Sequence, residues 1–323
     1  MKFSPYTDLA LEIAENICNN TIEGIEMNTE SCNLDNTTVT VVNITNNKGI
    51  EATGKPIGSY ITLESSFIKE NDIEAHEKLI SILSTHIKNL CPNETNTILV
   101  IGLGNSQVTP DSLGPKVVDK ILVTRHIKDT VPEDITNSVA SVAALAPGVM
   151  GMTGIETVEV VKGVTDRVKP DLVIAIDALA ARKVSRVNST IQLSNTGVAP
   201  GAGVGNKRKT IDKESLGVPV IAIGVPTVVD AATMANDTID RVIEALLNES
   251  TKGSQFYNML KDTAEEEKYK LIKEVLDPYA ENMFVTPKEV DAVIENLVNI
   301  IANSINIALH PGIELEDINR YKF

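Results

Sequence analysis

The stretch LVIGLGNSQVTPDSLGPKVV, residues 99–118, changes from the pattern of a buried strand to that of a helix. Its first residues form a continuous apolar run, which is typical of a strand covered on both faces. The turn that follows contains Gly102, Gly104 and Asn105, then a Thr-Pro pair and a single acid, Asp111. The stretch therefore predicts a strand–turn–helix unit of a parallel sheet, with a lone carboxylate at the entrance to the helix.

The same alternation continues along the middle of the chain, where apolar runs are separated by segments with helical spacing. Unbroken apolar strands separated by helices predict a mostly parallel sheet with helices on both faces. The expected strands are 97–103, 138–147, 171–177 and 218–226, and the expected helices are 113–127, 153–168 and 230–247.

Two flanking regions have different patterns. Residues 36–90 contain half-buried strands at 38–45 and 58–65 and a helix at 72–90, which together predict a β-rich N-terminal flank. After residue 248 the chain is charged and helical and ends with a long helical pattern over 286–310. The predicted fold class is therefore α/β, with a β-rich N-terminal flank and a helical C-terminal region.

Composition excludes several classes of partner. The formal net charge of −15 repels nucleic acid at long range, so no nucleic-acid partner is expected. Three cysteines, an odd number, fit free thiols in a reducing compartment. The N-terminus carries acids where a signal peptide needs an apolar run, and no later segment is expected to be long enough to span a bilayer. These features predict a cytoplasmic protein with no membrane partner.

Asp111 and Asp177 each follow an apolar strand. Both are therefore expected at the edge of the sheet where ligands bind in open parallel sheets. Burial after the run LVIAI would raise the pKa of Asp177 unless a partner stabilises its anion. If the two carboxylates meet, they share a proton, so that one activates water while the other protonates a leaving group. The alternative is that each acid is a helix N-cap, a role that Asp favours at strand-to-helix junctions. The sequence leaves both interpretations open.

Two glycine-rich stretches could also contribute to a site. In 195–210, Gly201, Gly203 and Gly205 precede Lys207, Arg208 and Lys209, but the spacing is that of neither a Walker loop nor a dinucleotide-binding fingerprint. We expect a loop that lines a cleft or contacts another subunit. A non-enzymatic phosphate- or nucleotide-binding module built on 199–209 is the alternative.

The second glycine-rich stretch, 145–157, either offers backbone amides to a substrate carbonyl or is a tight crossover loop. No metal site is expected, because no His other than His126 lies near Asp111 or Asp177 in the sequence.

Several unusual blocks together resemble the germination protease family of spore-forming bacteria, which degrades small acid-soluble spore proteins. They run in the same order from about residue 100 to residue 291 and include VTPDSLGPKVV, PGVMGMTGIET, IAIDALAAR, PGAGVGNKRK, VPVIAIGVPTVVDA and VTPKEVD. The resemblance implies an endopeptidase without a cofactor, grouped with the aspartic-type proteases and located in the spore core. The family's proposed catalytic acids fall on Asp111 and Asp177.

The resemblance also implies a zymogen that processes itself and assembles as a homotetramer. Residues 1–8 would be the propeptide, cut between Asp8 and Leu9, and residues 9–323 a single α/β endopeptidase domain. Family substrates carry an acid, an apolar residue, Ala, a variable position and Glu, and DLALE at 8–12 has that order. The alternative for this segment is an ordinary amphipathic helix start.

A second protease interpretation remains open. The glycine turn and lone acid of GLGN…D also look like those of hydrogenase-maturation endopeptidases, which share this kind of sheet and rely on a metal bound in their substrate.

Overall fold

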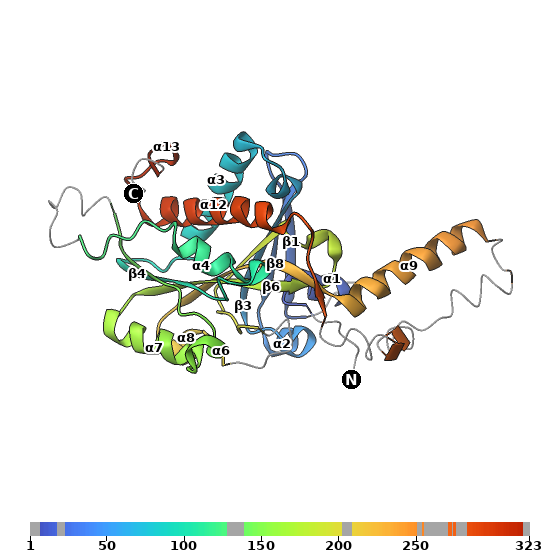
Figure 1. The fold of residues 1–323 in the computed structure, drawn as a ribbon, viewed down its shortest axis with the longest axis horizontal. Coiled ribbons are helices and arrows are strands. Elements are labelled where there is room, and N and C mark those ends of the chain that lie inside the picture. Colours follow the sequence, from blue (N-terminus) through green and yellow to red (C-terminus); the bar gives the residue numbers. More distant parts are fainter. Residues whose placement is uncertain are drawn as a thin grey trace.

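A single mixed sheet organises the chain in the computed structural model, which describes residues 7–17, 23–127, 139–201, 209–250, 254, 271–272, 274–275 and 283–318. Its strands lie in the order β1-β2-β3-β7-β8-β6-β4-β5, and β9 pairs with β8 (Figure 1). The strands are β1 Ile25–Ser31, β2 Thr37–Ile44, β3 Gly58–Ser65, β4 Thr97–Gly102, β5 Ser141–Leu145, β6 Leu172–Ala181, β7 Thr190–Ser194, β8 Val220–Asp230 and β9 Phe284–Val285.

Helices lie on both sides of this sheet, with α3, α4 and α12 on one side and α6, α7 and α8 on the other (Figure 1). The helices are α1 Ala10–Ile17, α2 Asn47–Thr53, α3 Ile73–Leu90, α4 Leu113–Val118, α6 Met150–Thr153, α7 Thr157–Val168, α8 Lys213–Leu216, α9 Ala231–Glu249, α12 Val290–Leu309 and α13 Leu315–Ile318. Three short 3₁₀ helices are η1 Ser66–Lys69, η2 Thr109–Asp111 and η3 Val184–Arg186.

The apolar strands at the centre are continuous because each of their faces is buried in a different core. Along β6, Leu172, Ile174 and Ile176 belong to the core shared with α3 and α12. Val173 and Ala175 alternate with them and belong to the core under α7 and α8. Since side chains alternate between the faces of a strand, both sets must be apolar, which confirms the predicted α/β class with helices on both faces.

The sheet is mixed, with a parallel half and an antiparallel half. The pairs β4–β5, β4–β6 and β6–β8 are parallel. The N-terminal strands β1, β2 and β3 are antiparallel and join the same sheet through β7, which is antiparallel to both β3 and β8. The β-rich N-terminal flank is therefore continuous with the parallel strands.

One expected helix is shorter than its sequence pattern. The helix predicted over 113–127 ends at Val118, as α4. Beyond it, the side chain of Asn306 on α12 hydrogen-bonds to the backbone. This side chain accepts from the N–H of Leu122 at 2.9 Å and donates to the carbonyl of Lys120 at 3.1 Å. Tertiary hydrogen bonds to α12 replace the next turn of the helix.

The helix α12 corrects the expectation that no later segment is long enough to span a bilayer. In the described part of the chain it is the one helix that is long and apolar enough to cross a membrane, by length and composition. Most of it is buried: residues such as Ile294, Leu297 and Ile301 pack against α3 and the sheet in the larger core. The long apolar sequence of α12 is therefore that of a helix buried in the core.

Candidate active site

The turn after β4 brings backbone against backbone and thereby positions Asp111. A Cβ on Gly102 would lie 2.2 Å from the carbonyl oxygen of Gly114, and one on Gly104 would lie 2.1 Å from that of Asp111. Gly104 also has φ of +111°, which side-chain-bearing residues rarely adopt. Within this turn the Asp111 carboxylate accepts a hydrogen bond from the N–H of Asn105 at 2.8 Å.

Asp177 lies inside strand β6, where the residue is 4% exposed. In the parallel ladder the residue before it, Ile176, pairs with Gly102, the last residue of β4. Asp177 is therefore located just beyond the end of the neighbouring strand, beside the turn that carries Asp111. One of its carboxylate oxygens accepts from the N–H of Ala178 at 3.0 Å.

Neither acid is an N-cap. Helix α4 has Ser112 at its N-cap, without a side-chain capping bond, and Asp111 bonds Asn105 in the preceding turn. Asp177 does not stand at a strand-to-helix junction, because β6 continues through Ala181. The capping interpretation was wrong for Asp177 because strand β6 is longer than its apolar run indicates, and wrong for Asp111 because this residue ends the 3₁₀ helix η2 and bonds back to its own turn.

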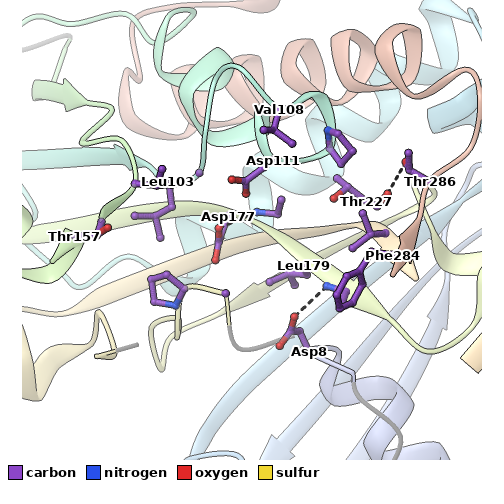
Figure 2. A pocket seen from close by; sticks show the side chains of 18 of the residues that line it. Asp8, Leu103, Val108, Asp111, Thr157, Asp177, Leu179, Thr227, Phe284 and Thr286 are labelled. Atoms are coloured by element: carbon purple, nitrogen blue, oxygen red, sulfur yellow. Dashed lines mark hydrogen bonds between the residues drawn. The ribbon is translucent and has the colours of Figure 1, made fainter. Parts of the chain in front are cut away.

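Asp111 and Asp177 line the same cavity of about 380 Å³. Figure 2 shows both side chains beside the same space, with Leu179 below them. Gly148 and Val149 from the expected loop 145–157 line this cavity, as does Gly201 from the loop 195–210. Both loops therefore contribute to a cleft. Of the latter loop, residues 202–208, with Gly203, Gly205, Lys207 and Arg208, lie outside the described residues.

The N-terminal segment enters this cavity through Asp8, which also lines it. The backbone N–H of Asp8 donates to the carbonyl of Ala180 at 3.1 Å, and the Ala180 N–H donates to the Asp8 carboxylate at 3.0 Å (Figure 2). Burial raises the pKa of Asp8, although the Ala180 hydrogen bond and the charge of Lys55 act in the opposite direction. Asp8 is thus held at the cavity by the backbone of β6.

The residues after Asp8 run beside β6, where Leu9 makes apolar contacts and Glu12 makes hydrogen bonds. Leu9 is fully buried in a small core whose other members are Leu179, Ala181, Val187 and Val229. Glu12 is 1% exposed, and its two carboxylate oxygens accept from the N–H groups of Arg182 at 2.8 Å and Lys183 at 2.9 Å.

Helix α1 is anchored further along by an ion pair. Two guanidinium nitrogens of Arg186 lie 2.9 and 2.6 Å from the two carboxylate oxygens of Glu15, and a third contact at 2.7 Å joins Arg186 to Glu64. Burial alone would raise the pKa of Glu15, but Arg186 and Lys183 outweigh it and lower the pKa to about 2. The segment is therefore bound by complementary charge as well as by apolar packing.

Both aspartates and the N-terminal segment were candidates from the sequence, whereas the residues that hold the segment were not. Lys55, Arg186 and Gln192 all contact it. Gln192 had a weak signal, since it lies between the two apolar residues of TIQLS, a segment that is buried throughout. Among the described residues there is no group of three or more His, Cys, Asp or Glu that could hold a metal ion.

Comparison with known proteins identifies the family. The germination protease family model matches residues 8–260 and 244–322. The chain is 49% identical over 315 residues to the germination protease of Caldanaerobacter subterraneus, covering 97% of each chain. It is 49% identical over 320 residues to that of Clostridium acetobutylicum, with 98% of each covered, and 43% identical over 356 residues to that of Bacillus subtilis, with 98% of this chain and 96% of the relative covered. The chain therefore belongs to the germination protease family and is a protease of spore germination.

Proposed function

We propose that this protease initiates the degradation of small acid-soluble spore proteins in the spore core, with Asp111 and Asp177 as its catalytic pair. The observation that carries the proposal is the common cavity of Asp111, Asp177 and Asp8, the last of which precedes the expected cleavage site. Side chains that come from three distant parts of the sequence thus line one space.

The pair works as a unit that shares one proton. The ionised carboxylate takes a proton from water, and the resulting hydroxide attacks the carbonyl carbon of the peptide after Asp8. The protonated carboxyl group gives its proton to the departing amide nitrogen of Leu9, which breaks the carbon–nitrogen bond. After the reaction the proton is again held by one member of the pair, so the site is ready for another turnover.

We also propose that the chain is made as a zymogen, with residues 1–8 as propeptide and residues 9–323 as the endopeptidase domain. The segment DLALE then imitates a substrate. Its acid, Asp8, is bound by Ala180, its apolar Leu9 is buried, and its final Glu12 is bound by two backbone amides. The N–H of Ala10 donates to Gln192, so each of the four positions that family substrates have in common is contacted by this chain.

The experiment is to replace each acid by its uncharged isostere and to follow removal of residues 1–8 by intact mass. For Asp111→Asn and Asp177→Asn we expect the first-order rate to fall by about 10²–10⁴-fold or more, because general acid–base catalysis is lost. Cleavage of a peptide with the acid–apolar–Ala–x–Glu order should fall in parallel.

The matched control is Asp166→Asn, at an exposed acid that pairs only with Lys162 of the same helix in the described part of the chain. It should process at the rate of the unaltered protein. All three variants should keep the circular dichroism spectrum of a folded α/β protein. If either dyad variant still removes residues 1–8 at close to the original rate, the proposed pair is not the catalytic group.

A further inference from the structure

The carbonyl oxygen of Asp8 is contacted by two side-chain donors. Lys55, in the connection between α2 and β3, donates from Nζ to this oxygen at 3.0 Å. Gln192, on β7, donates to the same oxygen from Nε2 at 3.4 Å. In the proposed function this is the oxygen of the peptide group that is cut.

The two donors approach the peptide from a side different from that of the aspartate pair. Lys55 and Gln192 line a second cavity of about 540 Å³, to which Asp8 also belongs. Asp111 and Asp177 line the first cavity. Asp8 lines both, so this residue lies between the cavity of the aspartate pair and the cavity of the two donors.

Lys55 is positioned for the carbonyl and not for a carboxylate. In the described part of the chain its Nζ makes no other hydrogen bond and no ion pair within 4.0 Å. Burial lowers the pKa of Lys55, while the charge of Asp8 raises it. Desolvation of an ammonium group is costly, and that cost is offset most when negative charge develops on the atom it faces.

Gln192 hydrogen-bonds to the backbone on both sides of Leu9, the residue that follows the cleaved bond. Its Oε1 accepts from the N–H of Ala10 at 2.7 Å, which directs its Nε2 toward the Asp8 carbonyl. The side chain is buried on β7, between β3 and β8. The same amide therefore fixes the position of the peptide and supplies a donor to its oxygen.

We infer that Lys55 and Gln192 form the oxyanion-binding site of this protease, an assignment that rests on the proposed cleavage after Asp8. When water adds to the carbonyl carbon, the electron pair of the C=O bond moves onto the oxygen. Lys55 and Gln192 hydrogen-bond to that oxyanion and keep their protons. The electron pair returns as the tetrahedral intermediate collapses and the nitrogen of Leu9 leaves with a proton from the aspartate pair. Donors at this position stabilise the transition state more than the neutral peptide.

The test uses the full chain and the rate of removal of residues 1–8, measured by intact mass. Lys55→Met removes the ammonium group and keeps an unbranched side chain, while Gln192→Glu keeps the acceptor for Ala10 and removes the donor. Each should slow processing by about 10²–10³-fold. Lys55→Arg, which retains a charged donor, should process faster than Lys55→Met. Lys48→Met is the control, since the exposed Lys48 pairs with Glu23, and it should leave the rate unchanged.

A second readout separates catalysis from docking. In the Asp177→Asn background, where cleavage is blocked, the amides of residues 8–15 should be equally protected from hydrogen exchange with and without Lys55→Met. A slow variant with lost protection would overturn the assignment, because Lys55 would then only position the segment.

The outcomes also distinguish this inference from the proposed function. If Asp111→Asn and Asp177→Asn are inactive but Lys55→Met and Gln192→Glu process within threefold of the unaltered rate, the aspartate pair stands and the oxyanion site is overturned. If the folded, unaltered protein does not remove residues 1–8 at all, the proposed self-processing fails and the oxyanion assignment fails with it.

Discussion

At the scale of single residues, Asp111 is held in place by contacts between backbone atoms. Gly102 at the end of β4 lies against Gly114 in α4, with no room for a side chain on either. A Cβ on Gly114 would lie 2.2 Å from the carbonyl oxygen of Leu103. The glycines are visible in the sequence as a turn signal, but their function is a close approach between a strand end and a helix, which only the fold reveals.

This packing predicts a clear difference between two Gly→Ala substitutions. Gly114→Ala forces β4 and α4 apart, so we expect a loss of about 1–3 kcal/mol in the free energy of unfolding. Processing should slow as well, because Asp111 moves with the turn. Gly163→Ala is the control, since Gly163 lies in helix α7 with no atom within 4 Å of its added Cβ. It should stabilise by up to about 1 kcal/mol.

Urea denaturation and the processing rate measure both effects. Equal stabilities for Gly114→Ala and Gly163→Ala would show that the β4–α4 contact relaxes without cost.

At the scale of elements, the segment of Asp8 and α1 is a short piece of chain held almost entirely by tertiary contacts. An eight-residue helix is not stable alone in water, so its contacts with β6, η3 and β7 must order it. The expected helix start within DLALE is confirmed, because Ala10 begins α1, whereas the cleavage site between Asp8 and Leu9 stays a prediction. The partners were not predictable, since Lys183, Arg186 and Gln192 are distant in sequence and no local pattern links them to α1.

The pKa shifts in this segment predict that docking strengthens as the pH falls. The pKa of Asp8 is raised from 3.8 in the docked state, so docking is fully favoured below 3.8 and weakens as the pH rises through the raised value. The pKa shift of Glu15 has the opposite sign. Its pKa is lowered from 4.5 to about 2, so the ionised Glu15 favours docking at every pH above 4.5. Of these two groups, only Asp8 can therefore change docking at a pH above 4.5.

Hydrogen exchange of residues 8–15 in the Asp177→Asn background, corrected for intrinsic exchange rates, measures docking without cleavage. Protection should increase as the pH is lowered from neutral to 4.5. Asp8→Asn should make protection independent of pH in this range, whereas Glu23→Gln, at an exposed acid, should not. The same pH dependence in Asp8→Asn would assign the effect to another group.

At the scale of the whole molecule, the α/β class follows from the sequence because buried parallel strands are continuous apolar runs. Asp111 and Asp177 were predictable candidates for the same reason, since both follow such runs. The antiparallel half was harder to place. Residues 38–45 and 58–65 were recognised as strands, but their connection to the parallel strands depends on β7, which pairs with Gly58–Ser65 on one side and β8 on the other. Such pairing between distant segments leaves no local signal.

The expected homotetramer stays a prediction, and the outer part of α9 is a candidate for its subunit contact. Figure 1 shows α9 projecting from the sheet, and of its described residues only Thr233 and Asn236 are buried. Val242 is 53% exposed and Leu246 39% exposed on this projecting part. Exposed apolar side chains on an extended helix are typical of a surface that packs against another protein surface.

If this helix packs between copies of the chain, a charge placed on its apolar face should break the assembly. For Val242→Asp we expect a weakening of about 3 kcal/mol or more, roughly a hundredfold in the association constant, because an unpaired carboxylate would be buried. Asn248→Asp adds the same charge at an exposed polar position of α9 and should leave the assembly intact. Sedimentation velocity distinguishes the two, with Val242→Asp shifting to smaller species.

A tetramer that survives Val242→Asp would place the subunit contacts elsewhere, and an unaltered protein that sediments as a monomer would contradict the assembly itself. Because residues 8–15 dock within their own chain, Val242→Asp should still remove residues 1–8, so the two properties are separable by a single substitution.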